Sequence, residues 1–218
     1  MIWDWEFALQ TIPRLLEHFL KFTLVATAVG SLLAAVIGLA FAMIRRARIP
    51  VLAQLTTVIV EFIRSTPLPI HLLFLFYGLP SFGPTLEPLT AGIIGLGIHY
   101  ACYYAEVYRA GIDAVPTGQW EASTALHLSP AITWRQVVLP QAVRNVLPAL
   151  GNYVVAMFKE TPFLLLITVP ELVFTANLIA SNTANYVEPF TMAALIFLAA
   201  SYPTALLVRK LERRLEAW

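Results

Sequence analysis

Charged residues are scarce in this sequence of 218 residues. Asp, Glu, Lys and Arg make up only 12% of it, whereas roughly 25% is typical of soluble proteins. Hydrophobic residues account for 59% and the mean hydropathy is +0.74. A chain of this length could not bury so much apolar surface in one core. We therefore expect much of it to face lipid, as an all-α integral membrane protein.

Neither sign of charge is in excess, because 14 Lys and Arg oppose 13 Asp and Glu for a net charge of +1. This balance excludes a nucleic-acid reader that works through a basic field. The sequence holds one cysteine, Cys102, within an apolar run. A single cysteine excludes an intrachain disulfide and a cysteine-based zinc site. We expect Cys102 to be a small packed side chain.

A secretory signal is also missing from the beginning of the sequence. It reads Met-Ile-Trp-Asp-Trp-Glu, which is acidic and aromatic where such a signal is basic, and no short apolar region with a small-residue cleavage site follows. We expect the first membrane span to stay uncleaved, with residues 1–18 outside the cytoplasm.

Five stretches are apolar and long enough to cross a bilayer core of about 30 Å, which needs roughly 20 helical residues. They are residues 22–44, 53–80, 89–110, 145–169 and 189–208. Pro67 and Pro69 predict a break near the middle of the second stretch. Residues 172–187 are uncharged up to their end but too polar to span, and they are expected to form an outer-surface helix or loop.

The positive-inside rule orients these spans. The predicted cytoplasmic segments hold nine basic residues: Arg45, Arg46, Arg48, Arg135, Arg144, Arg209, Lys210, Arg213 and Arg214. The outer loops after the first span hold none. The N-terminus is therefore predicted outside and the C-terminus in the cytoplasm. No internal repeat is visible, which disfavours an inverted-repeat transporter contained in one chain.

Residues 113–144 form the predicted cytoplasmic loop. Prolines at 116, 130, 140 and 148 are expected to divide this region into two or three short helices, with Ser129 as an N-cap. Two apolar faces result: Trp120, Ala122, Ala125 and Leu126 on the first block, and Ile132, Trp134, Val137 and Val138 on the second. Such a knob either fits a groove in another protein or packs under its own bundle, and periodicity does not decide between the two.

The run EASTALHLSPAITWRQVVLPQAVR resembles the EAA loop of the permease subunits of ATP-binding-cassette (ABC) importers. Glu121, Ala122, Leu139 and Pro140 match the usual form of that loop. Ser123 stands where the family has a second alanine, and His127 stands where it has a glycine that permits the bend between two short helices. The resemblance makes these six residues the candidates for coupling to an ATPase.

Three further runs, at 61–80, 103–122 and 152–172, resemble their counterparts in the polar amino acid uptake branch of the family. The resemblance implies a MetI-like type I permease fold over residues 19–215, in a bacterial inner membrane. It also implies three partners: a separate ATPase subunit, an extracytoplasmic solute-binding protein and a second permease chain, identical or homologous. The sequence has no Gly-x-x-x-x-Gly-Lys-Ser/Thr motif, so ATP and Mg are expected on the ATPase and no cofactor on this chain. The expected substrate is a polar amino acid or a similar small zwitterion, ectoine and hydroxyectoine included.

Charged residues inside the predicted spans need partners or water, because each isolated charge costs roughly 2.5–3.5 kcal/mol there. Glu61 and Arg64 are three residues apart and can pair on one helix face. Lys159 and Glu160 are adjacent and point in different directions, so at least one of them needs a partner elsewhere. A Thr-Pro pair follows each of these two charged sets, and helices broken by proline in mid-membrane are where importers place polar ligands. The candidate translocation-path residues are Glu61, Arg64, Thr66, Lys159, Glu160 and Thr161. Alternatively, these charges only lock helices together.

The remaining polar residues of the spans favour structural roles. Glu106 and Arg109, three residues apart, are expected to be interfacial scaffolding. His18, His71 and His99 have no spacing partner for a metal ion and are expected to be packing or interfacial residues. No pattern supports catalysis. Two alternatives to an ABC permease remain, an ion-coupled secondary transporter and an intramembrane enzyme or structural subunit.

Overall fold

The computed structural model describes residues 3–47 and 49–216, and every regular element within these two ranges is helical. The α-helices are α1 (Trp5–His18), α2 (Leu24–Arg46), α3 (Pro50–Arg64), α4 (Leu68–Leu73), α5 (Pro88–Asp113), α6 (Thr117–Ala125), α7 (Pro130–Ile132), α8 (Leu139–Glu160), α9 (Leu172–Thr183) and α10 (Val187–Glu216). Short π or 3-10 stretches extend several of them, at Phe19–Thr23, Phe74–Gly78, Leu79–Phe82, Thr133–Val138 and Thr161–Ile167. The predicted all-α class is confirmed.

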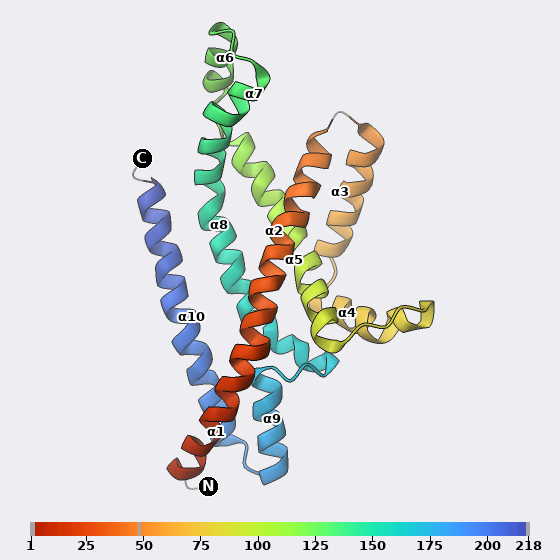
Figure 1. Ribbon diagram of the computed structural model, residues 1–218, viewed down its shortest axis with the longest axis vertical. Helices are drawn as coiled ribbons and strands as arrows, with labels where there is room; N and C mark the ends of the chain where they lie inside the picture. The colour runs from red at the N-terminus through yellow and green to blue at the C-terminus, as the bar shows by residue number, and fades with distance from the viewer. Residues whose placement is uncertain (1–2, 48, 217–218) are drawn as a thin grey trace.

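The long helices run side by side in an elongated bundle (Figure 1). Helices α6 and α7 and the turn between α2 and α3 lie at one end, and the N-terminus and α9 lie at the other. Helix α4 points away from the bundle axis. This places the predicted cytoplasmic loop and the predicted outer helix at opposite ends of the molecule.

The first helix begins earlier than the predicted span. Helices α1 and α2 form one continuous helix, Trp5–Arg46, through the π turn between them. Asp4 caps its beginning by accepting a hydrogen bond from the Phe7 N–H at 3.1 Å. Ala8 and Leu15 on α1 are fully buried in a cluster with side chains of α9 and α10. Apolar packing therefore extends the helix over much of the expected extracytoplasmic segment 1–18, of which residues 1–2 lie outside the described chain.

By length and composition, three helices in the described chain could cross a membrane: Trp5–Arg46, Pro130–Ile167 and Val187–Leu215. A fourth span results if Pro50–Arg64 and Leu68–Phe82, bent by 104° to one another, count as one. The break predicted in the second stretch is therefore present. Helix α5, which contains the predicted span 89–110, is not among these candidates. It packs against α2, α4 and α8, so protein rather than lipid surrounds much of it.

Helix α2 approaches the centre of α5 closely at Gly38. A Cβ atom added there would lie 2.8 Å from the backbone oxygen of Ala101 on α5. Only glycine permits this approach, which brings the last turn of α2 beside the C-terminal half of α5.

The expected division of residues 116–148 by four prolines is half right. Helix α6 is a short separate helix, and Ser129 Oγ accepts from the Ile132 N–H at 3.4 Å at the start of α7, as predicted. From there, however, the chain stays helical through Pro140 and Pro148 as far as Ile167. A π stretch, Thr133–Val138, directly precedes Pro140. Because a π turn already departs from the α-helical bonding pattern, the missing N–H of Pro140 does not end the helix.

The region 172–187 contains a helix, α9, as one of the two predicted possibilities. Glu171 caps it by accepting from the N–H groups of Val173 and Phe174 at 2.9 and 2.6 Å. Leu172 and Ala176 on α9 are fully buried, in the cluster shared with α1 and α10. The helix is therefore part of the bundle rather than a loose surface segment.

Candidate functional site

A cavity of about 480 Å³ opens where α3 breaks before α4. One wall is the break itself, residues 64–69, and the others come from α5 and from the point where α8 becomes a 3-10 helix. The polar or aromatic side chains that line it are Arg64, Ser65, Thr66, His99, Tyr103, Glu160 and Phe163. A cation and an anion from different helices thus face one cavity.

Arg64, the cation, has hydrogen-bonding capacity that the described residues do not use. Its Nη1 lies 3.2 Å from Glu61 Oε1 and 3.8 Å from Glu106 Oε1, and its guanidinium carbon lies 5.3 Å from the ring centre of Tyr103. The Nε–H is buried, and no partner accepts from it among the described residues. A guanidinium with an unused N–H fits a carboxylate, because both groups are planar and can bond through two atoms.

Glu160, the anion, is held by α5. Its Oε2 accepts a hydrogen bond from the Tyr100 hydroxyl at 2.8 Å. Tyr100 belongs to an aromatic group with Tyr103 and Tyr153, in which ring centres lie 5.5 to 6.2 Å apart and Tyr100 meets Tyr153 edge to face. This aromatic support fixes Glu160 at the end of α8, where the helix changes to 3-10 geometry.

The six predicted path residues do not all meet in this cavity. Arg64, Thr66 and Glu160 line it, and Glu61 pairs with Arg64 from outside the lining. Lys159 is exposed on the other side of α8 and lines a different cavity of about 340 Å³ beside α10. Thr161 is fully buried, and its hydroxyl donates to the Phe158 carbonyl at 2.7 Å. Lys159 and Thr161 therefore do not line this cavity, and the structure brings only the other four candidates together here.

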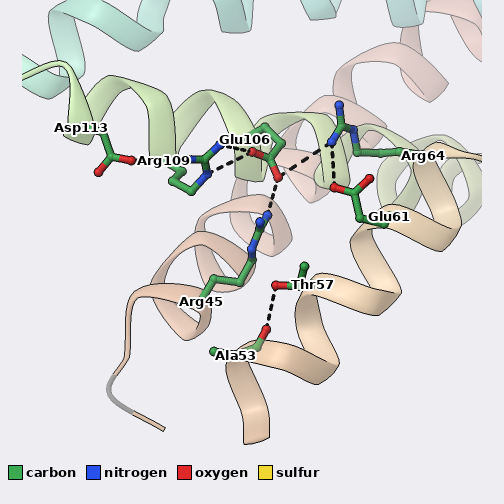
Figure 2. Close-up of polar contacts among 8 residues, drawn as sticks. All are labelled: Arg45, Ala53, Thr57, Glu61, Arg64, Glu106, Arg109 and Asp113. Atoms are coloured by element: carbon green, nitrogen blue, oxygen red, sulfur yellow. Dashed lines mark hydrogen bonds and ion pairs between the residues drawn. The ribbon is translucent and has the colours of Figure 1, made fainter. Parts of the chain in front are cut away.

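Glu106 lies at the centre of a cluster of arginines from several helices (Figure 2). The sequence predicted only its pair with Arg109. The predicted pair with Arg109 is present, with Arg109 Nη2 at 2.8 Å from Glu106 Oε2. The other carboxylate oxygen is bonded by Arg45 from the end of α2 and lies 3.8 Å from Arg64 on α3. Three arginines on three helices thus share one carboxylate. One signal for the Arg45 contact was available, since both residues were predicted near the cytoplasmic end of a span.

Two of the histidines do have a partner in space. The Nδ1 atoms of His71 on α4 and His99 on α5 lie 3.3 Å apart, so one ring donates a hydrogen bond to the other. His18 Nδ1 lies 2.7 Å from the Pro170 carbonyl. The prediction of packing or interfacial roles for all three did not include the His71–His99 contact, because the two residues are 28 positions apart in the sequence. The described residues contain no group of three or more metal-ligating side chains.

In the predicted cytoplasmic loop, residues 113–144, which we call the coupling loop, some side chains of the two predicted apolar faces are packed inside and others are exposed. Trp120 and Trp134 meet edge to face at 5.5 Å and pack on Ile112, Val115, Val138 and Ala142. Leu126, by contrast, is 71% exposed and Ile132 is 40% exposed. Glu121 and Ala122, beside Leu126, are exposed as well. One set of side chains packs under the bundle, and the other is free to meet a partner.

His127 adopts the backbone conformation that a glycine would favour. Its φ is +51°, in the left-handed region. The Leu128 N–H bonds to the Ser123 carbonyl and the His127 N–H to the Thr124 carbonyl, both at 3.0 Å. This pattern is the Schellman motif, which ends helices at a left-handed residue. The bend expected from the usual glycine is therefore made by a histidine.

Similarity to known proteins bears on this geometry. A family model described as a binding-protein-dependent transport system inner membrane component matches residues 26–217. The chain is 42% identical over 203 residues to the probable amino-acid ABC transporter permease protein y4tG of Sinorhizobium fredii, covering 93% of this chain and 87% of that protein. It is 35% identical over 195 residues to the probable glutamine ABC transporter permease protein GlnP of Bacillus subtilis, covering 88% and 89%. It is also similar to a chain in a crystal structure of an amino acid ABC transporter with histidines, with a TM-score of 0.92 and 34% identity over 98% of this chain and 100% of that one.

Proposed function

Since this chain belongs to the family of binding-protein-dependent transport system inner membrane components, we propose that the cavity beside Arg64 and Glu160 is part of a path for a small zwitterion. The chain is a permease subunit of an amino-acid ABC importer and a multi-pass protein of the bacterial inner membrane. Its relatives are permease subunits rather than enzymes. The alternative of an ion-coupled secondary transporter is therefore not favoured.

The observation that carries the proposal is the pairing of opposite charges across one cavity. A zwitterion loses water when it enters a membrane-embedded site, so the site must replace water around both of its charges. The Arg64 guanidinium matches a carboxylate, and the Glu160 carboxylate matches an ammonium group. The break after α3 beside Arg64 adds backbone carbonyls that no longer serve a helix, and α8 changes to 3-10 geometry beside Glu160. The substrate class is a polar amino acid or a compact zwitterion such as ectoine or hydroxyectoine.

Uptake by the assembled transporter tests this assignment. The probes are radiolabelled L-glutamine, L-histidine, L-arginine, L-glutamate and ectoine, supplied with the binding protein. Arg64→Gln and Glu160→Gln each remove one charge, and we expect each to reduce uptake at least about tenfold, which corresponds to ~1.4 kcal/mol of lost substrate interaction. Glu17→Gln is the matched control, because the one ion pair of Glu17 among the described residues is with Lys21 in the next helical turn, and both side chains are exposed.

The outcome for complex assembly separates the two roles considered for these charges. A path role predicts that both variants assemble normally and fail to transport. A helix-locking role predicts loss of the complex, because removing one partner leaves a poorly solvated charge. Full uptake in both variants would contradict both roles.

We also propose that the exposed face of the coupling loop docks on a separate ATPase subunit. Glu121, Ala122, Leu139 and Pro140 are exposed and available for contact, whereas Ser123 and His127 shape the turn behind them. The chain lacks a P-loop, so ATP and Mg belong to that subunit. The other proposed partners are an extracytoplasmic binding protein that delivers substrate and a second permease chain, identical or homologous, beside this one.

The proposed topology has five spans with the N-terminus outside and the C-terminus in the cytoplasm. It counts the bent pair of α3 and α4 as the second span and α5 as the third. Support comes from the basic residues in the described part of the predicted cytoplasmic segments. They lie in the last turn of α2, in or just before the first turns of α8 and in the last turns of α10 (Arg45, Arg46, Arg135, Arg144, Arg209, Lys210, Arg213 and Arg214). Tags at residues 1 and 218 should be accessible from opposite sides in intact and permeabilised cells. Both tags on one side would rule out an odd number of spans.

A further inference from the structure

A line of alternating charges runs from the cavity to the coupling loop. It begins at Arg64, which lines the cavity and lies 3.8 Å from Glu106. Glu106 is bonded in turn by Arg45 and Arg109 (Figure 2). Arg109 Nη1 lies 3.3 Å from Asp113, one helical turn further along α5. Each step joins groups of opposite charge.

The line ends on the aromatic pair of the coupling loop. Arg46 Nη1 lies 3.1 Å from Asp113. The Arg46 guanidinium also lies over the rings of Trp120 and Trp134, at 5.9 and 5.4 Å from their centres. Contacts of this kind attract by about 0.5–1 kcal/mol at exposed sites. A series of charged contacts therefore connects Arg64 to Trp120 on α6 and to Trp134 in the π stretch beside it.

The contacts of Glu106 are unequal. Its side chain and that of Arg45 are only 20% and 15% exposed, so their pairing is little screened by water. Arg109 is bound through both Nε and Nη2, at 3.0 and 2.8 Å. The contact with Arg64 is much longer, at 3.8 Å. Of the three arginines, Arg64 is therefore the one that another carboxylate can most easily draw away.

We propose that Glu106 is a positioning residue that competes with the substrate carboxylate for Arg64, and that this competition reports cavity occupancy to the coupling loop. The inference rests on the proposed function. An empty cavity leaves Arg64 to Glu61 and Glu106. A bound carboxylate takes Arg64 over, so Glu106 is left to Arg45 and Arg109, and the balance of Arg109 between Glu106 and Asp113 changes. Because Asp113 pairs with both Arg109 and Arg46, a change in its contact with Arg109 also changes the position of Arg46 over the Trp120–Trp134 pair.

The first test measures ATP hydrolysis by the assembled transporter in lipid vesicles, with its ATPase and binding protein. The probes are the same five solutes, added with the binding protein. Glu106→Gln removes the charge of one of the two carboxylates that hold Arg64, the one connected to the coupling loop, while retaining its shape. We expect the half-saturating solute concentration to fall and the maximal stimulation of hydrolysis to fall at least about fivefold, the lower end of typical coupling between sites. A merely structural residue would lower the amount of complex without moving these two quantities in that pattern.

Glu17→Gln serves again as the matched control and should change neither quantity. Unchanged stimulation and half-saturation in Glu106→Gln would overturn the inference, as would a rise in the half-saturating concentration. A wild-type transporter that none of the five solutes stimulates would instead count against the proposed function.

The second test needs no substrate. Basal hydrolysis rates are compared for Arg64→Gln, Asp113→Asn and the double variant. Arg64 and Asp113 share no direct contact in the described structure, so independent sites would give rate changes that multiply. If the line of charges connects the two residues, the rate change of the double variant should differ at least about twofold from the product of the two single-variant rate changes. Rates that multiply would refute the line of charges even if transport proves to be as proposed.

Discussion

Replacing Gly38 by alanine tests whether the close approach of α2 to α5 supports the charged network. The added Cβ would lie 2.7 Å from Tyr104 Cβ and 2.8 Å from the Ala101 backbone oxygen, whereas ordinary contacts begin at 3.4 Å. Both obstacles belong to the rigid part of α5, so no side-chain rotation relieves them. The two helices must separate by the missing 0.6–0.7 Å. Overpacking of this kind costs about 1–3 kcal/mol, and we expect a value of ~3 kcal/mol here.

Thermal unfolding of the purified transporter measures this cost. We expect a lower Tm for Gly38→Ala, together with reduced uptake, because moving α2 draws Arg45 away from Glu106. Gly118→Ala is the control, since a Cβ at Gly118 would have no neighbour within 4 Å. Alanine favours helix over glycine, so the control should leave the Tm unchanged or slightly higher. Equal Tm values for Gly38→Ala and the wild type would refute the reasoning.

Three further predictions concern single residues. His127→Gly should raise the free energy of unfolding by about 0.5–1 kcal/mol in thermal melts, because glycine adopts φ of +51° without strain; His127→Ala should give no such gain. Glu121→Lys should leave the chain in the membrane but reduce co-purification with the ATPase and uptake, because a reversed charge opposes docking; undiminished binding and uptake would contradict the coupling role. Burial raises the pKa of Glu171 to about 7, although two backbone N–H groups oppose the shift. The folded state therefore binds more protons than the unfolded state between about pH 4.5 and 7, and stability should fall as pH rises through that window; a melting series should show this slope, and Glu171→Gln should remove it.

The sequence was sufficient for the parts of the fold that depend on local rules. Uncharged runs marked the helices, Pro67 marked the break between α3 and α4, and Ser129 marked the start of α7. It was insufficient where packing overrides those rules. Pro140 suggested an end to a helix that the preceding π stretch allows to continue. Residues 5–18 carried no strong membrane signal, yet they are helical because α9 and α10 bury one side of α1.

The candidate site shows the same division between local and distant information. Glu61 and Arg64 pair as their spacing predicted, since residues three apart share a helix face. The contacts of Arg64 with Glu106 and of Glu160 with Tyr100 join residues 42 and 60 positions apart. No spacing rule reports such contacts, because they depend on how α3, α5 and α8 cross. The hub at Glu106 therefore became visible only once the helices were placed.

Lys159 and Glu160 explain why a charged pair in the sequence need not be a charged pair in space. Neighbouring residues on an α-helix point about 100° apart. Glu160 consequently faces α5 and the cavity of Arg64, while Lys159 faces α10 and a separate cavity. The cation that shares a cavity with Glu160 is Arg64, on a helix almost one hundred residues earlier in the chain. A zwitterion between them would touch α3 where it breaks before α4 and α8 where it changes to 3-10 geometry, so binding it would constrain the relative position of the two helices. This is the physical reason for expecting occupancy of this cavity, rather than of the one beside Lys159, to be felt along α5.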